Sequence, residues 1–211
     1  MSANQKNNPF VFYLQQSWLL MVSAIIFGCL LASLNAAWQP KIIQNEIDKF
    51  NALAGGLLNT DRPFETALES VSVDIGKGKT YSVEVKKAAD ANGALIGWAF
   101  VCEGSGFADK IKLVVAVDAA FETMAGFGVL ASNETPGFGD KINIPDGFYQ
   151  SQFEGAPVTE LKLEKIGDAE QIDDQIIAIS GATVTSEAVV KIFNTFLLPI
   201  KEKMQEQNLL Q

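Results

Sequence analysis

Four consecutive residues near the C-terminus combine hydroxyl groups with small side chains: Ser180-Gly181-Ala182-Thr183. An apolar run precedes them at residues 176–179 and an amphipathic segment follows, so the sequence predicts a turn between a strand and a helix. Small residues let a ligand approach the backbone, and unpaired amides at a helix N-terminus attract anions. The Thr183 hydroxyl also offers an oxygen for a covalent bond. The turn therefore favours a phosphate-bearing cofactor, although Ser and Thr are also common where an ordinary helix begins.

A second segment of interest is rich in glycine and lies at residues 133–140, with the sequence Asn-Glu-Thr-Pro-Gly-Phe-Gly-Asp. Its Pro136-Gly137 pair fits the two central positions of a type II turn, in which glycine takes a positive φ. Phe138 could place its ring beside a ligand, and Glu134 and Thr135 offer polar contacts. A plain hairpin loop would use the same residue types, so this segment alone does not establish a site.

The residue types that are missing or rare restrict the chemistry. The chain has no histidine, which excludes Ser-His-Asp and Cys-His catalysis and histidine-ligated metals. Its two cysteines, Cys29 and Cys102, are too few to hold an iron–sulfur cluster. We therefore expect no metal site, and any redox chemistry needs an organic cofactor. The net charge of −9 and the lack of a basic cluster argue against nucleic-acid binding.

The N-terminal part predicts one membrane-spanning helix. No charged residue occurs between Asn7 and Pro40. Trp18 and Trp38 enclose an apolar run, and twenty helical residues span about 30 Å, the thickness of a bilayer core. The run is longer than the apolar part of a typical signal peptide, so we expect an uncleaved anchor. Lys6 on one side and Lys41 on the other leave its orientation undecided.

We therefore predict three parts: an N-terminal segment at residues 1–16, a transmembrane helix at residues 17–38 and one extramembrane domain at residues 39–211. The domain is long enough to form its own core. Its apolar spacing predicts a helix at residues 41–58 that stops at Gly55-Gly56 and a last helix from about Ser186 to Gln205, with a kink or break at Pro199. Between them the pattern predicts strands at residues 81–87, 95–102, 111–117 and 124–130, and another marked by Leu161, Leu163 and Ile166. The fold class is thus α+β, with a mostly antiparallel sheet flanked by helices.

Taken in order along the chain, these features resemble a known family, the FMN-binding G subunits of the ion-translocating Rnf electron-transport complex. The related C subunits of the sodium-pumping NADH:quinone reductase share the same motifs. The resemblance rests on the N-terminal anchor and three motifs, Gly104-Ser105-Gly106-Phe107, Glu134-Thr135-Pro136-Gly137-Phe138-Gly139-Asp140-Lys141-Ile142 and Ser180-Gly181-Ala182-Thr183-Val184-Thr185-Ser186.

The resemblance implies a covalent FMN, joined through its phosphate to Thr183. A dedicated flavin transferase makes this bond in the family, with FAD as the donor. The resemblance also places Glu134 and Thr135 near the flavin, and from the spacing we expect Thr185 to be a hydrogen-bond partner of the cofactor. The expected cofactor-binding residues are Thr183, Ser180, Gly181, Ala182, Thr185, Glu134, Thr135, Gly137 and Phe138, and no residue is expected to be catalytic.

The resemblance further implies an electron relay. In Rnf complexes electrons pass from reduced ferredoxin to NAD and drive sodium or proton translocation. The implied partners are the membrane subunits A, D and E and the peripheral subunits B and C. The FMN domain would lie on the extracytoplasmic, periplasmic side of the cytoplasmic membrane, with the N-terminus inside.

Two positions depart from the family pattern. Family members often have a histidine where this chain has Ser132, and an acidic residue where it has Ile177. Other interpretations therefore stay open: a C-type quinone-reductase subunit, a stand-alone membrane-tethered flavoprotein, or a non-redox binding or assembly module whose Ser-Gly-Ala-Thr turn is only structural.

Overall fold

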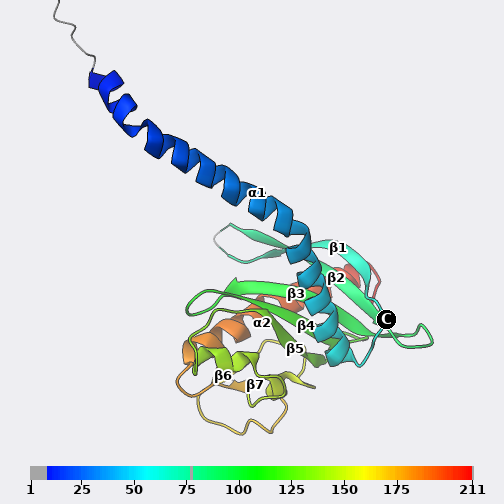
Figure 1. The fold of residues 1–211 in the computed structure, drawn as a ribbon. Coiled ribbons are helices and arrows are strands. Elements are labelled where there is room, and N and C mark those ends of the chain that lie inside the picture. Colours follow the sequence, from blue (N-terminus) through cyan, green and yellow to red (C-terminus); the bar gives the residue numbers. More distant parts are fainter. Residues whose placement is uncertain (1–8, 77, 211) are drawn as a thin grey trace, which may run out of the picture. The chain divides into compact units, whose positions relative to one another are not determined.

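The computed structural model describes residues 9–76 and 78–210. Residues 1–8 of the N-terminal segment predicted at residues 1–16, Lys6 among them, lie outside these ranges. The chain divides into two units, an N-terminal helical part up to Ile47 and a compact domain at Asp48–Gln211. Figure 1 shows the order of their elements along the chain.

The described residues of the N-terminal part belong to one continuous helix, α1 (Pro9–Leu58), which runs through Pro40 without interruption and has its last turns in the compact domain. It contains the one candidate membrane span among the described residues, with a mean hydropathy of 2.2 in its most apolar window. Large apolar side chains along it are exposed, such as Leu20 at 73 %. Because a helix with this surface needs an apolar surrounding, the chain is a single-pass membrane protein.

Helix α1 ends at Leu58, as predicted, but the residues that stop it are not the predicted ones. Gly55-Gly56 does not stop the helix, which continues to Leu58. The stop is made by Asn59, whose φ of 51° is left-handed, and by a hydrogen bond from the Thr60 amide to the Gly55 carbonyl (3.0 Å). Asn at this position is an alternative to glycine in a Schellman end.

The centre of the domain is a five-stranded antiparallel sheet in which each strand pairs with the next along the chain. The strands are β1 (Glu65–Asp74), β2 (Thr80–Ala89), β3 (Leu95–Ser105), β4 (Lys110–Asp118) and β5 (Met124–Ala131). The strands predicted from residue 81 to residue 130 correspond to β2–β5. Strand β1 is absent from the prediction because register shifts on both sides of Leu68 break its alternation.

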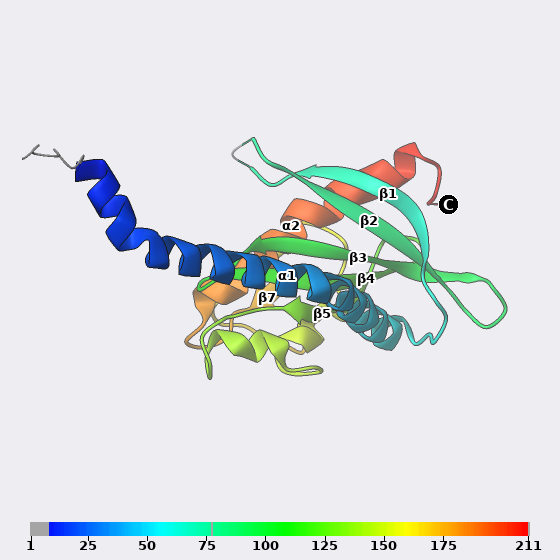
Figure 2. The ribbon, with the colours of Figure 1, turned by 45° about the horizontal axis from the view of Figure 1, so that its top comes forward.

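Helices cover both faces of this sheet (Figure 2). On one face the last turns of α1 place Phe50 and Ala54 against Ala99, Val114 and Leu130. On the other face α2 (Thr183–Glu206) packs its apolar side into the main core. This arrangement confirms the α+β class and the antiparallel sheet flanked by helices.

The segment between β5 and α2 is mostly irregular. It contains two short 3-10 helices, η1 (Gly139–Asn143) and η2 (Gln150–Phe153), and a parallel pair, β6 (Lys162–Glu164) and β7 (Gln175–Ile177). Ile166 is outside β6 and 91 % exposed, so the predicted strand is shorter than expected. Helix α2 begins three residues before the predicted Ser186, and Pro199 lies inside it without ending it.

Candidate functional site

The Ser-Gly-Ala-Thr turn connects β7 to α2 through a tight backbone reversal. The Ala182 amide donates to the Ile179 carbonyl (2.9 Å), and Gly181 has a φ of +80°. A Cβ at Gly181 would lie 3.1 Å from the Phe138 ring. Glycine is therefore required here both for its conformation and for the close approach of the neighbouring loop. As a result, Thr183 becomes the first residue of α2.

The N-terminus of α2 lacks a side-chain cap. Ala182 occupies the N-cap position and makes no capping hydrogen bond with its side chain. The Ser186 amide donates to the Ala182 carbonyl (3.0 Å), so the amides of Thr183, Val184 and Thr185 come before the first intrahelical bond. Such amides, together with the helix dipole, suit a phosphate group.

A network of buried hydrogen bonds fixes the first turn of α2. The Ser186 hydroxyl donates to the Ala182 carbonyl and accepts from the Ile179 amide, both at 3.0 Å. The Tyr149 hydroxyl donates to the Ser186 carbonyl (2.8 Å). Burial raises the pKa of Tyr149 well above its usual value, so its hydroxyl remains a donor. No local sequence pattern connects Tyr149 with the turn, so its role is not predictable from the sequence.

The Glu-Thr-Pro-Gly segment forms the predicted turn. The Phe138 amide donates to the Thr135 carbonyl (3.2 Å), and Gly137, at the third position, has a φ of +76°. Both features are those of a type II turn with Pro at its second position. A Cβ at Gly137 would meet no atom within 4 Å, so this glycine serves the turn's conformation.

Glu134 and Thr185 join the two motifs in the interior. The Thr185 hydroxyl donates to Glu134 Oε2 (2.6 Å), and both residues are buried. The other carboxylate oxygen, Oε1, accepts from the Ala108 amide (3.1 Å). The Glu134 carboxylate thus holds together the loop before β4, its own loop and the start of α2.

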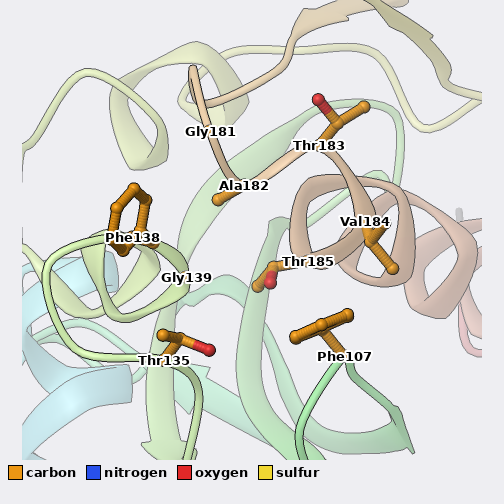
Figure 3. Close-up of a pocket in the computed structure, with 9 residues that line it drawn as sticks. All are labelled: Phe107, Thr135, Phe138, Gly139, Gly181, Ala182, Thr183, Val184 and Thr185. Atoms are coloured by element: carbon orange, nitrogen blue, oxygen red, sulfur yellow. The ribbon is translucent and has the colours of Figure 1, made fainter.

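A pocket of about 420 Å³ is lined in part by Thr185 (Figure 3). Phe107 and Phe138 are exposed and lie on opposite sides of it, and Thr135 and Thr185 lie between them. Thr183 is at the rim and half-buried. The residues that line the pocket are Phe107, Thr135, Phe138, Gly139, Gly181, Ala182, Thr183, Val184 and Thr185.

The structure thus gathers most of the expected site residues at one place. Glu134, Gly137 and Ser180 are adjacent to the pocket in sequence but are not among its lining residues. Conversely, Phe107, Gly139 and Val184 line the pocket but are not among the expected cofactor-binding residues. All three lie within the motifs on which the family resemblance rests, so their position in those motifs was the available signal.

The two departures from the family pattern have clear structural contexts. The Ser132 hydroxyl accepts from the Glu134 amide (3.4 Å), so it supports the loop of the buried carboxylate. Ile177 is buried, and its amide donates to Gln152 Oε1 (2.7 Å). An acidic side chain at Ile177 would need a different local environment, because a buried charge without a partner is unstable.

The site residues fit a flavin mononucleotide. The uncapped helix start suits its phosphate, the two exposed rings suit an aromatic ring system, and the volume lies within the range of cofactor pockets. Among the residues that the structure describes, no cluster of metal-ligating side chains occurs.

Comparison with protein families gives a match for residues 106–197 to the FMN-binding domain. Among curated proteins, the chain is 31 % identical to the G subunit of the ion-translocating oxidoreductase complex of Cereibacter sphaeroides over 193 residues, which cover 88 % of this chain and 81 % of that protein. It is 26 % identical to the G subunit of the Na⁺-translocating ferredoxin:NAD⁺ oxidoreductase complex of Acetobacterium woodii, over 83 % of this chain and 86 % of that protein.

A shorter match is to the G subunit of the ion-translocating oxidoreductase complex of Methanosarcina acetivorans, with 36 % identity over 104 residues. The chain spans about half the length of that relative (51 %), and 49 % of this chain is matched. Among solved structures, the fold is similar to NqrC of Shewanella oneidensis, with a TM-score of 0.56, 25 % identity and coverage of 74 % of this chain and 73 % of that one.

Proposed function

The chain belongs to the family of G subunits of ion-translocating oxidoreductase (Rnf) complexes, and on this basis we propose that it carries electrons on an FMN joined covalently to Thr183. It is a redox subunit with an FMN-binding domain and one N-terminal membrane helix. The single observation that carries the covalent bond is the position of Thr183, a hydroxyl residue at the rim of the pocket and at an uncapped helix N-terminus.

The attachment uses the Thr183 hydroxyl as the acceptor of a flavin-phosphate group. In the proposed transfer from FAD, the Thr183 oxygen forms a bond to the flavin-side phosphorus and the phosphoanhydride bond breaks. AMP leaves and the hydroxyl proton is released to solvent, so the step needs no oxidant or reductant. A flavin transferase supplies the catalysis, since the residues around Thr183 include no histidine and no lining carboxylate.

The residues of the pocket then have separate tasks. The amides of Val184 and Thr185, at the start of α2, stabilise the phosphodiester anion. Phe107 and Phe138 provide apolar surfaces for the flavin ring, and the Thr135 hydroxyl is a hydrogen-bond partner within reach of the pocket. When bound, FMN supplies the electron transfer, and the protein positions it without acid–base catalysis.

Membership of an Rnf complex implies which subunits are the partners of this protein. We propose that it works with membrane subunits A, D and E and peripheral subunits B and C of a ferredoxin:NAD oxidoreductase, as one component of a translocase. Residues 17–38 form the span and residues 39–211 the FMN domain on the extracytoplasmic side. The name of the relative from Acetobacterium woodii supports the ferredoxin:NAD assignment.

The test is ultraviolet-excited fluorescence of the denatured protein in a gel, from a host that contains the flavin transferase. We expect a fluorescent band for the wild type, none for Thr183→Ala, and a retained band for Ser180→Ala, which changes an exposed neighbouring hydroxyl. Mass spectrometry of the peptide that contains Thr183 should show one FMN less one water. A dark wild-type band beside a fluorescent control flavoprotein would contradict covalent attachment and favour the non-redox module.

A further inference from the structure

A second recess of about 490 Å³ lies beside the candidate cofactor pocket and shares no residue with it. Its walls are residues 75, 76 and 79 between β1 and β2, the ends of β3 and β4 that face each other, and the second to fourth turns of α2. The hairpin turn between β3 and β4 separates the two recesses, since Ser105 and Lys110 line this one and Phe107 lines the other.

Three lysines from three different elements line this recess, which we call the lysine cleft: Lys79, Lys110 and Lys191. They face a single lining carboxylate, Glu103, which accepts from Lys110 Nζ at 2.6 Å. That hydrogen bond raises the pKa of Lys110 above its usual value, so the ammonium group stays charged.

The ammonium groups of Lys79 and Lys191 have no ion-pair partner within residues 9–76 and 78–210. All three lysines are exposed. The cleft is therefore a local positive surface on a chain whose net charge is −9. Because like charges elsewhere repel an acidic partner, such a surface selects where that partner can bind.

The floor of the cleft is apolar and well packed. Ile192 and Phe196 are buried, and the Tyr81 ring meets the Phe196 ring edge to face with centroids 5.6 Å apart. A Cβ at Gly104 would collide with the Ile192 side chain, so this glycine allows the end of β3 to lie against α2. Ile75 also lines the cleft and is 42 % exposed, so the lining offers accessible apolar surface while the rim accepts negative charge.

The mixed lining of the cleft favours a peptide over a single small anion, because apolar side chains line it together with the three ammonium groups. The lysines come from the β1–β2 turn, from the start of β4 and from α2, so each is placed by a different element. The cleft lies beyond the first turn of α2, where free amides could have surrounded one phosphate. Separate ammonium groups around an apolar floor match separate carboxylates along a peptide that also inserts an apolar side chain.

We propose that the lysine cleft binds an acidic segment of a neighbouring protein subunit, with its carboxylates at Lys79, Lys110 and Lys191 and an apolar side chain on the floor. The inference rests on the proposed function, because it places the chain inside a multisubunit complex. It assigns to α2 two tasks at different turns: cofactor attachment at Thr183 and subunit contact at Lys191.

The experiment is zero-length carbodiimide crosslinking in intact membranes that contain the assembled complex, followed by mass spectrometry. This reagent joins lysines to carboxylates only when they are in contact. We expect Lys79 and Lys191 to be joined to Asp or Glu of a protein that copurifies with the flavoprotein, at yields about tenfold above Lys165. Lys165 is the matched control, because it is exposed, has no ion pair in the described chain and lies outside the cleft.

A charge-reversed variant tests the proposal without relying on the crosslinking yield at Lys79 and Lys191. In Lys79→Glu/Lys191→Glu we expect the crosslink at Lys110 and the retention of the flavoprotein in the complex after a salt wash to fall, with Lys165→Glu as the control. Crosslinks at the cleft no more abundant than at Lys165 would overturn the proposal. So would protection of the lysines from acetylation without crosslinks, which indicates a lipid headgroup or a small anion.

Flavin fluorescence of the same gel bands separates this proposal from the proposed function. Both lysine variants should keep a fluorescent band, because neither residue lines the cofactor pocket. A fluorescent wild-type band without crosslinks at the cleft lysines overturns the subunit contact but not the covalent flavin. Crosslinks at these lysines together with a dark wild-type band contradict the covalent flavin but not the subunit contact.

Discussion

The Thr185 hydroxyl donates a hydrogen bond of 2.6 Å to the Glu134 carboxylate across 51 positions of sequence, and both groups are buried. Gly139 fits beside this contact, since a Cβ there would lie 2.7 Å from the Thr185 oxygen and 2.9 Å from Glu134 Oε2. The contact therefore joins the two motifs on which the cofactor pocket depends, and one of its partners, Thr185, lines that pocket.

Thr185→Val tests this contact with a side chain of nearly the same shape. The substitution leaves one oxygen of a buried carboxylate without its donor, so the free energy of unfolding should fall by about 1–3 kcal/mol. Denaturant unfolding of the full chain in detergent, followed by the fluorescence of buried Trp98, measures this change. Thr195→Val is the control, because that hydroxyl donates only to the Lys191 carbonyl on its own helix. Equal stability of the two variants would mean that Glu134 finds another donor.

Gly181→Ala should destabilise the domain through two separable causes. A left-handed φ costs an L-residue about 1–2 kcal/mol, and the added Cβ also presses on the Phe138 ring. In the double variant Gly181→Ala/Phe138→Ala the ring is gone and only the backbone strain remains. Gly181→Ala should therefore cost less stability in the Phe138→Ala background than in the wild type. Urea midpoints of the four proteins give the coupling. Full recovery in the double variant would show that the backbone adapts to alanine without strain.

Tyr149→Phe should loosen the start of α2 without changing the pocket lining. The variant loses one buried hydrogen bond to the Ser186 carbonyl, and we expect a loss of about 1 kcal/mol in the free energy of unfolding. Amide hydrogen exchange of the first turn of α2 should increase more than exchange in β3 and β4. Uniform acceleration in all elements would point to a global effect instead.

Much of the site follows from the sequence because its elements are local. Pro136-Gly137 specifies a type II turn by itself, and the small residues at 181–182 specify a tight entry into a helix. Glu134 shows the limit of this reasoning. Its place in the motif associates it with the cofactor, whereas its contacts come from the loop at Ala108 and from the first turn of α2 at Thr185, which are far apart in sequence. Only the folded domain brings these elements together.

Fold elements were missed for similar reasons. Bulges shift the register of β1 beside Leu68, so its apolar and polar residues do not alternate regularly. An alternating pattern therefore does not identify it as a strand. The end of α1 depends on Asn59 in a conformation that most sequences give to glycine, while Gly55-Gly56 looked like the stop. Tyr149 supports the helix start through a single hydroxyl, a contact that no spacing rule contains.

Asp109 should contribute a pH dependence to stability. A hydrogen bond from Asn133 (2.9 Å) and one from the Lys110 amide (2.8 Å) lower the pKa of its carboxyl. A lowered pKa in the folded state means that the contribution is present above the usual value of 3.8 and is lost as the pH falls through the folded pKa. Asp109→Asn should therefore flatten the loss of stability between about pH 5 and pH 3. Unfolding at several pH values measures it, and an unchanged slope would exclude the contribution of this group.

The two exposed aromatic rings give the most direct test of where the flavin ring lies. If Phe107 and Phe138 flank it, Phe107→Ala and Phe138→Ala should keep the covalent flavin but change its emission in the folded protein, since the loss of either apolar ring exposes the isoalloxazine to water. Phe148→Ala is a matched control, because Phe148 is as exposed as Phe138 (56 % and 54 %) and does not line the pocket. The band in a denaturing gel should be equally bright in all four proteins. Equal emission from the folded proteins would place the ring elsewhere, with Thr183 acting as an anchor outside the pocket.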